Sequence, residues 1–458
     1  MYWYDVFPQV VLADRESSVR IHPRFEHVKL KSSRQLQIFT SPFGGMTESG
    51  MMGAYRWGSN DGEKVDYEMQ GDDIILHHWF AGEQEHNIQL VITDRENPDF
   101  FERRSIKIYS LHRDLLSLRP FKGETHSHSS GSDGREDPRF VVARYREKGF
   151  DFAAVTDHGN YESSQTAHDF WQESVPDFNI VQGEEVHAPG NPVHIVNFGG
   201  TKSVNDMYRQ NEECYHQEVG QTAENLPSDL SPEVRRITAS CRWVFDRIRS
   251  VGGLAIYAHP FWKMSRNVLP FPVVDAVFND RRYDAVELLG GFYREESEAN
   301  NFQMIYCLEQ WAKGNRFPVV GASDSHGSVI FPENRPSVVN FIGKNSVSAA
   351  DADLFGWYFT VVLGENNSTG EVIRQIKAGN SVAVEAIPGN VPHIFGSLRL
   401  VKYVSFLLRE LFPVLSSLYR AQGETMISLL AGEEEAAERL KLLSGRVDLR
   451  REKFFTGR

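Results

Sequence analysis

The stretch GETHSHSSGSDG, residues 123–134, places two histidines one residue apart and an aspartate five positions further on, in a Gly-Ser turn. It fits neither the apolar stripe of an amphipathic helix nor the alternation of a half-buried strand. On an extended segment, residues i and i+2 project to the same side, so His126 and His128 present both imidazoles to one space. We therefore expect a chemically active segment that follows a strand.

Beyond this stretch, short apolar strands alternate with amphipathic helices, which is typical of a parallel α/β sheet or barrel. The expected strands are FAAVT, NIVQGEE, VHIVNF, LAIYA, DAVELL and FPVVGAS. One helix is expected to begin after the N-cap Asp137, with Pro138 at its first position, and to close at Gly149. The polar residues 201–236 interrupt the alternation and are predicted to be an insertion or a lid.

The two ends of the chain have different patterns. Residues 1–118 hold short β-branched and aromatic runs between glycine-rich turns, which predicts a β-rich accessory domain. This domain is interpreted as a structural cap, with substrate binding or a subunit interface as the alternative. Residues 391–458 are predicted to form a helical appendage that docks on the central domain, residues 119–390, or makes an oligomer.

Bulk composition bounds the class of protein. The 458 residues include 49 Lys and Arg against 62 Asp and Glu, a net charge of −13 that disfavours nonspecific binding to nucleic acid. The three cysteines have no metal-ligand spacing, which fits a reducing compartment. The first residues lack a basic segment that leads into an apolar run, and later apolar runs are short or interrupted. We expect a soluble, cytoplasmic protein without a membrane partner.

Histidines and carboxylates recur where the predicted strands end. In parallel α/β domains these ends converge on one crevice. One histidine at a strand end is usually structural, but five decorated ends in succession are hard to obtain by chance. Imidazole and carboxylate without sulfur suit Zn, Mn or Fe at a hydrolytic site, and their number exceeds the needs of one ion. His187 is an open case, because on a strand it would share a face with Glu185.

The motifs GETHSHSSGSDG, VTDHG, GEEVH…VHIVNF, AHP and GASDSH, in this order, resemble the PHP family, named for polymerase and histidinol phosphatase. The resemblance covers about residues 119–390, because VIRQIKAGNSVAVEA is similar to the closing helix and strand of such domains. It implies a distorted seven-stranded (β/α) barrel, a TIM-like fold. It also implies up to three divalent ions at the carboxyl rim: zinc, manganese or iron, with magnesium as a further alternative.

The resemblance also implies a trinuclear ligand set. The first ion would be held by His126, His128, Glu185 and Asp324. The second would share Glu185 and add His194 and His259. The third would be held by Asp133, His158 and His326. The family has an acidic residue at the position of Glu185, although the neighbouring Glu184 leaves that choice open. Some relatives carry histidine where this chain has Asp133, so the third site would bind more weakly or select another metal.

The expected enzyme is a metal-dependent phosphoesterase that cleaves a small phosphate ester or short nucleotide through a hydroxide bridging two ions. Lys263 and Arg266, just past AHP, are the candidates for phosphate contacts, ahead of Ser129 and Arg135. Asp157 is expected to orient its neighbours rather than to bind metal.

Two other functions stay open. The same centre would serve a carbon-ester or carbamate hydrolase, and a third reading is a non-catalytic, metal-stabilised scaffold. The complete ligand set counts against the scaffold. The expected partner is a small phosphorylated substrate, without a stable nucleic-acid partner, and a homo-oligomer is a further expectation.

Overall fold

The computed structural model describes residues 3–44, 62–262, 269–291, 298–327 and 355–457. The chain divides into two compact units. Unit 1 comprises residues 1–119, 402–415 and 445–458, and unit 2 comprises residues 120–401 and 416–444. The C-terminal residues predicted to form an appendage are thus divided between both units.

Unit 1 contains two β-sheets around one apolar core. Its strands are β1 (Tyr4–Phe7), β2 (Val10–Leu12), β3 (Arg15–Pro23), β4 (Arg34–Pro42), β5 (Glu63–Val65), β6 (Tyr67–Gln70), β7 (Asp73–Phe80), β8 (Gln84–Asp94) and β9 (Phe101–Leu111). They form the sheets β1-β3-β7-β6 and β2-β9-β8-β4-β5. Alternate residues such as Val19, Ile21 and Ile38 are fully buried in the core, because a strand points successive side chains to opposite faces. The predicted β-rich N-terminal part is confirmed.

C-terminal residues complete unit 1. The short helices η1 (Glu26–Val28) and α2 (Arg113–Leu116) belong to its first segment. Residues 402–415 lie on α13 (Leu398–Glu410) and α14 (Phe412–Leu430), and residues 445–458 contain α16 (Arg446–Thr456). On α13, the rings of Tyr403 and Phe406 lie 5.0 and 5.3 Å from the ring of Tyr109. Aromatic packing of this kind explains why these helical residues join the β-rich unit.

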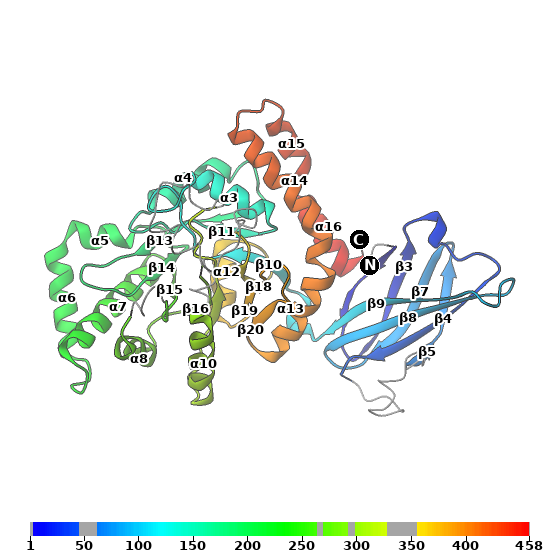
Figure 1. Cartoon of the computed structure of the whole chain (residues 1–458), viewed down its shortest axis with the longest axis horizontal. Helices are drawn as coiled ribbons and strands as arrows, with labels where there is room; N and C mark the ends of the chain where they lie inside the picture. The colour runs from blue at the N-terminus through cyan, green and yellow to red at the C-terminus, as the bar shows by residue number, and fades with distance from the viewer. Residues whose placement is uncertain (1–2, 45–61, 263–268, 292–297, 328–354, 458) are drawn as a thin grey trace. The chain divides into compact units, whose positions relative to one another are not determined.

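Unit 2 also contains two sheets, which are mixed rather than wholly parallel (Figure 1). The first has the order β12-β11-β10-β18-β19-β20 and the second β13-β14-β15-β16-β17. The strands are β10 (Arg119–Glu124), β11 (Phe152–Ala154), β12 (Asn179–Val181), β13 (Gly183–Val186), β14 (Ile195–Phe198), β15 (Leu254–Tyr257), β16 (Ala285–Leu289), β17 (Val319–Gly321), β18 (Tyr358–Gly364), β19 (Ser381–Glu385) and β20 (His393–Phe395). β10, β11 and β12 pair in parallel, as do β15, β16 and β17, whereas β14 runs antiparallel to both of its neighbours.

The two sheets of unit 2 are linked at several points. Isolated bridges join Ser127 to Ser325 and His158 to Glu185. The Thr360 hydroxyl on β18 also hydrogen-bonds to the backbone of Gly321 on β17. Apolar residues of both sheets share one core. The α/β class is confirmed, while closure into a seven-stranded barrel stays a prediction.

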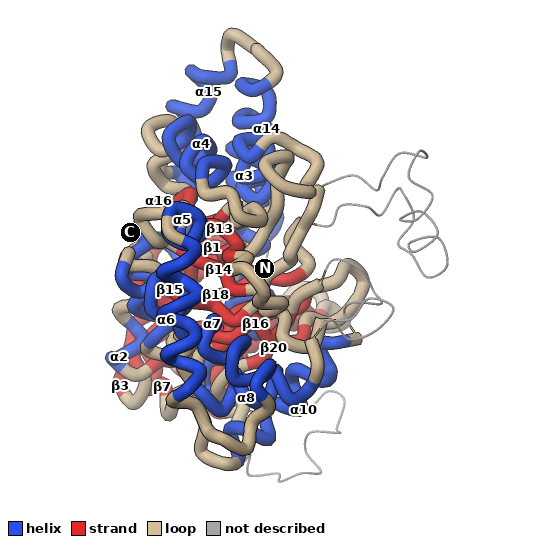
Figure 2. The backbone as a smooth tube through the Cα atoms, turned by 90° about the vertical axis from the view of Figure 1, so that its left-hand side faces the viewer, coloured by secondary structure: helices blue, strands red, loops and turns tan. Residues whose placement is uncertain are grey.

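Helices connect and extend the strands of unit 2, and α15 (Ala436–Leu443) projects away from the sheets (Figure 2). The helices are α3 (Pro138–Glu147), α4 (Glu162–Trp171), α5 (Val204–Gln210), α6 (Glu212–Glu224), α7 (Pro232–Ser250), α8 (Phe271–Asp280), α10 (Ala299–Ala312), α12 (Thr369–Lys377) and α15, together with residues 416–430 of α14. Asp137 caps α3 by accepting a hydrogen bond from the Arg139 amide, as the sequence predicts. Across the described residues, no helix has the length and apolarity that a membrane span requires.

A buried polar network joins α14 to the rest of unit 2. The Arg146 guanidinium, fully buried on α3, lies 3.0 Å from Asp177 and donates to Gln422 on α14 over 2.7 Å. Tyr419, one turn earlier on α14, donates to the Asp151 carboxylate over 2.7 Å. Because each buried charge has a partner, the network fixes this part of α14 against α3 and the segments that precede β11 and β12.

Candidate metal centre

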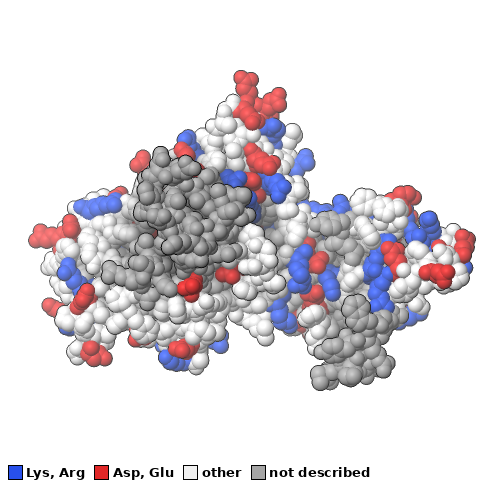
Figure 3. Space-filling view, in the orientation of Figure 1, with Lys and Arg blue, Asp and Glu red and all other residues white. Residues whose placement is uncertain are grey.

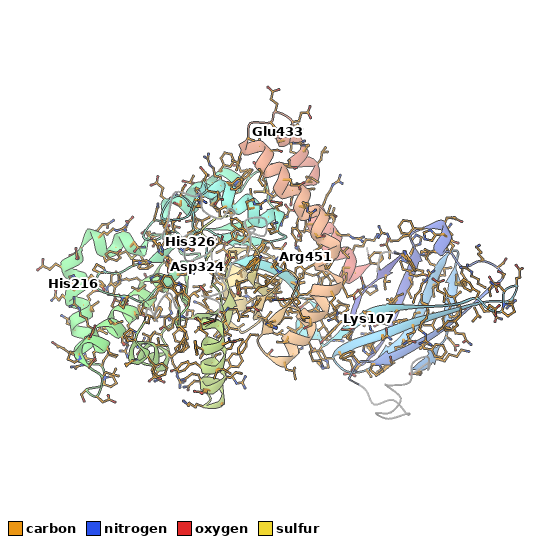
Figure 4. The ribbon with its side chains drawn as sticks, viewed as in Figure 1. Lys107, His216, Asp324, His326, Glu433 and Arg451 are labelled. Carbon is orange, nitrogen blue, oxygen red and sulfur yellow. The ribbon has the colours of Figure 1, made fainter. Side chains whose placement is uncertain are left out.

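Imidazoles and carboxylates converge where the strands of unit 2 meet. In five overlapping groups, the nitrogen or oxygen atoms of at least three side chains lie within 4.8 Å of one another. The residues in these groups are His126, His128, Asp133, His158, Glu185, His187, His194, His259, Asp324 and His326. The structure thus brings together the nine ligands expected from sequence and adds His187. Asp324 and His326 follow β17, and the His326 Nδ1 atom lies 2.9 Å from the Asp324 carbonyl oxygen, whereas Figure 4 shows His216 well apart from them on α6.

Strand direction explains why these side chains meet. His126, His158, His259 and Asp324 follow the carboxyl ends of β10, β11, β15 and β17, which lie at one edge of the fold. His194 immediately precedes β14. Because β14 is antiparallel to its neighbours, its beginning lies at that same edge.

The first predicted ligand set forms a compact, buried group. The Nε2 atoms of His126 and His128 both lie 3.6 Å from the Oε2 atom of Glu185. They lie 3.4 and 2.9 Å from the Oδ1 atom of Asp324. Ligands that surround one ion tetrahedrally at about 2.1 Å stand about 3.4 Å apart, so these spacings fit a common cation.

The second set lies on the other side of Glu185. The Oε1 atom of Glu185 is 2.7 Å from the Nδ1 atom of His194 and 3.7 Å from the Nε2 atom of His259. The two oxygens of one buried carboxylate therefore face different imidazoles. This is the arrangement that a carboxylate needs to join two cations.

The third set is closer to solvent. The Asp133 carboxylate, whose side chain is 56% exposed, lies 3.3 Å from the Nε2 atom of His326 and 3.5 Å from that of His158. The His128 ring stacks on the His326 ring, with centroids 4.3 Å apart. This set therefore adjoins the first one, and its exposed aspartate leaves it open to a ligand from solvent.

Glu184 and Glu185 serve different purposes. Side chains alternate along β13, so the two carboxylates point to opposite sides. Glu184 accepts hydrogen bonds from the Ser203 hydroxyl and the Asn205 amide, each over 2.8 Å, and from the Val204 backbone at the start of α5. The structure thus places Glu185 among the histidines and Glu184 at a helix N-terminus, where a carboxylate is stabilised.

Several atoms of the site are buried and lack a hydrogen-bond partner among the described residues. They are the Nε2 atoms of His126 and His128, both carboxylate oxygens of Glu185, the Nδ1 atom of His194 and the Oδ1 atom of Asp324. Unpaired buried polar atoms are rare because each costs free energy. A group of lone pairs that face one another fits divalent cations, so the donor set suits a metal centre.

The electrostatics of the cluster agree with this assignment. Burial alone would lower the pKa of His126, but the carboxylates of Asp324, Glu185 and Glu287 raise it well above its ordinary value. Burial raises the pKa of Asp324, but His126, His128 and His326 lower it well below its ordinary value. Positive charge thus holds the Asp324 carboxylate ionised, and bound cations would supply positive charge at the same place.

Two of the ligand positions have unusual backbone conformations. His259 and Asp324 have φ angles of +24° and +49°, in a region that residues other than glycine rarely adopt. The Asp324 amide donates to the His126 carbonyl over 3.0 Å, which helps to hold this turn. Strain of this kind persists where the surrounding structure fixes it, and it is concentrated at functional sites.

Two carboxylates that support the site were missed in the sequence. Glu287, buried on β16, lies 2.8 Å from the Nδ1 atom of His126. Glu124 accepts from the amides of His126 and Ser323, at 3.1 Å each, and so ties the segment after β10 to the one after β17. Burial raises the pKa of Glu124 to about 8. The sequence did contain a signal for Glu287, because DAVELL places an acidic residue within an otherwise apolar strand.

Glu287→Gln is expected to weaken metal binding about 10- to 100-fold without unfolding the chain. The carboxylate fixes the tautomer and orientation of the His126 ring, so that Nε2 faces the other ligands. Equilibrium dialysis against Mn²⁺ measures the affinity, and circular dichroism checks the fold. An unchanged affinity would show that Glu287 does not position His126.

The structure also locates the other residues singled out in the sequence. Asp157 accepts hydrogen bonds from the Ser129 amide and the Ser132 hydroxyl, each over 2.7 Å, and from the Ser129 hydroxyl. Asp157 therefore orients the turn before Asp133. The Ser129 hydroxyl, a candidate for phosphate contact, is hydrogen-bonded to Asp157. The Arg135 amide donates to the His326 carbonyl, so this residue lies beside the third set. Lys263 and Arg266 lie outside the described residues.

No family model matches the chain, and no curated protein matches its sequence. Solved structures give low-identity likenesses. A two-domain protein from Bacteroides vulgatus, with a domain predicted to be a PHP-like metal-dependent phosphoesterase, is 15% identical at a TM-score of 0.36. The match covers 59% of this chain and 66% of that one, just under two thirds.

Two further structures are similar at this level. A proposed metal-dependent phosphoesterase from Bifidobacterium adolescentis is 17% identical over 50% of this chain and 97% of its own, at a TM-score of 0.31. An amidohydrolase from Chromobacterium violaceum is 18% identical over 44% and 87%, also at 0.31. The chemistry of this chain is therefore inferred from its own residues.

Proposed function

We propose that the chain is a metal-dependent hydrolase of PHP type, a phosphoesterase that cleaves a small phosphate ester or a short nucleotide. The observation that carries the proposal is the set of buried, unpaired imidazole and carboxylate atoms around Glu185. A structural histidine would use its nitrogens for hydrogen bonds within the protein. These atoms instead face one another at 2.7 to 3.6 Å without a hydrogen-bond partner among the described residues.

The proposed ligands follow the three groups of side chains. His126, His128, Glu185 and Asp324 would hold the first ion, Glu185 with His194 and His259 the second, and Asp133 with His158 and His326 the third. Divalent ions held there would supply Lewis acidity toward water and toward phosphoryl oxygens. Zinc, manganese and iron all suit imidazole and carboxylate donors without thiolates.

The chain's own residues give the centre its shape. Glu287 orients His126, and Asp157 holds the turn that carries Asp133. Glu124 accepts hydrogen bonds from the amides of His126 and Ser323 and so holds together the segments that carry His126 and Asp324. Because the two oxygens of Glu185 face separate imidazole sets, the site is built for adjacent cations, which suits a reaction that spreads negative charge over several phosphoryl oxygens.

The test is phosphate release by the purified full chain from sugar phosphates, nucleotides and phosphodiesters, with Mn²⁺ and again after chelation. We expect metal-dependent release from a subset of these substrates and none from His128→Ala. Release that survives complete metal removal would overturn the proposal. Cleavage of carbon esters or carbamates alone, by the metal-loaded protein, would replace the phosphoesterase with the other hydrolase.

A further inference from the structure

The helix α5, within the polar residues 201–236, is fixed to the strand that carries the shared carboxylate. The Asn205 side chain accepts from the His187 amide and donates to the Glu185 carbonyl, each over 3.1 Å. The Tyr208 hydroxyl donates to the His187 carbonyl over 2.8 Å. Asn205 is fully buried, and Tyr208 nearly so. The hydrogen bonds of Asn205 and Tyr208 hold α5 in place against the segment that carries Glu185 and His187.

Arg209, also on α5, extends over Gly159, the residue that follows the third-set ligand His158. A Cβ atom added at Gly159 would lie 2.6 Å from its Nη2 atom, so the guanidinium lies directly over Gly159. Gly159 follows His158, and its amide donates to the Glu185 carbonyl over 2.9 Å. Its φ of +60° also favours glycine. The absence of a side chain at position 159 leaves space for the guanidinium next to a proposed metal ligand.

The charge of Arg209 is available to a ligand. The Nη1 atom of Arg209 lies 3.3 Å from the Oδ1 atom of Asp206. The Arg209 side chain is 50% exposed and that of Asp206 is 59% exposed. An ion pair this exposed is worth little, because water screens it. Figure 3 shows basic and acidic side chains interspersed over the end of unit 2 formed by α5, α6 and α7. The feature that distinguishes Arg209 is therefore its contact with Gly159.

We propose that Arg209 binds the phosphoryl oxygens of the substrate and selects a phosphate monoester over a neutral ester. This inference rests on the proposed function. A guanidinium presents parallel N–H donors that match two oxygens of a phosphate, and such charge-assisted pairs are about twice as strong as neutral hydrogen bonds. A carbon ester or carbamate offers no matching pair of charged oxygens.

The experiment compares Arg209→Met with two controls, Arg236→Met and Asp206→Asn. Arg236 is another exposed arginine, at the start of α7, and Asp206 is the ion-pair partner of Arg209. We expect Arg209→Met to raise KM for phosphate monoesters about 10- to 100-fold, from the loss of hydrogen bonds to a charged group. It should weaken binding of inorganic phosphate to the Mn²⁺-loaded protein by a similar factor. Arg209→Lys should be intermediate, and both controls should match wild type.

Metal content and circular dichroism establish that each variant is loaded and folded. Phosphate affinity and KM in Arg209→Met equal to wild type would overturn the inference and leave the proposed function intact. A metal-loaded wild type that does not bind phosphate would overturn it too. Phosphate binding that depends on Arg209, in a protein that hydrolyses no phosphate ester, would contradict the proposed function and, with it, a role of Arg209 in substrate selection.

Discussion

Glu185→Gln is expected to lower phosphate release on the order of a thousandfold and to reduce the number of bound metal ions. The Oε1 atom of Glu185 faces His194 at 2.7 Å, and its Oε2 atom faces His158 at 2.5 Å and both His126 and His128 at 3.6 Å. An amide keeps one of these acceptors and replaces the other with a donor. The variant therefore loses the shared charge while keeping the side-chain volume. Metal analysis and steady-state rates measure the two effects.

The neighbouring residue provides a matched control. Glu184→Gln introduces the same chemical change one position earlier, where the carboxylate binds the start of α5. It should lower the melting temperature, because the amide nitrogen then faces donors, at a cost of about 1 to 3 kcal/mol. Metal content and turnover should stay near wild type. Equal losses of metal in Glu184→Gln and Glu185→Gln would show that Glu185 does not bind the metal ions directly.

Removal of metal is expected to abolish phosphate release and to lower the melting temperature by several degrees. Buried imidazoles and carboxylates without partners destabilise the folded state, whereas a ligand at a hundredfold excess over its Kd stabilises it by about 2.7 kcal/mol. Readdition of Mn²⁺ or Zn²⁺ should restore both properties. Calorimetry of the chelated and reloaded protein measures the shift.

The response of Glu185→Gln shows whether the stabilisation arises at this site. The variant should show a smaller rise in melting temperature on addition of metal than wild type. If chelated protein, verified as metal-free, keeps its rate and its melting temperature, the cluster does not depend on cations. A rise of equal size in the variant would place the stabilising ion elsewhere.

Residue spacing predicts the convergence of most of these side chains. Apolar runs mark the strands, and His126, His158, His259 and Asp324 follow them, so the rule that parallel strands end at one edge predicts their approach. The contribution of His194 also depends on β14 running antiparallel to its neighbours. That pairing is a long-range property that no local pattern expresses.

The supporting residues were harder to predict for the same reason. Glu287 reaches His126 across 161 positions of sequence, and Arg209 meets Gly159 from a polar segment without a recognisable motif. The helical residues 402–415 join unit 1 because aromatic rings on α13 pack against β9. Helical periodicity identifies an apolar face but does not identify the surface against which it packs.

Crystals of the full chain grown with Mn²⁺, measured at the manganese absorption edge, test the metal centre most directly. We expect anomalous peaks between the two oxygens of Glu185 and their surrounding imidazoles, with a further, weaker peak beside Asp133, His158 and His326. Density that shows these side chains bonded to one another, with manganese absent or only at the protein surface, would contradict this expectation.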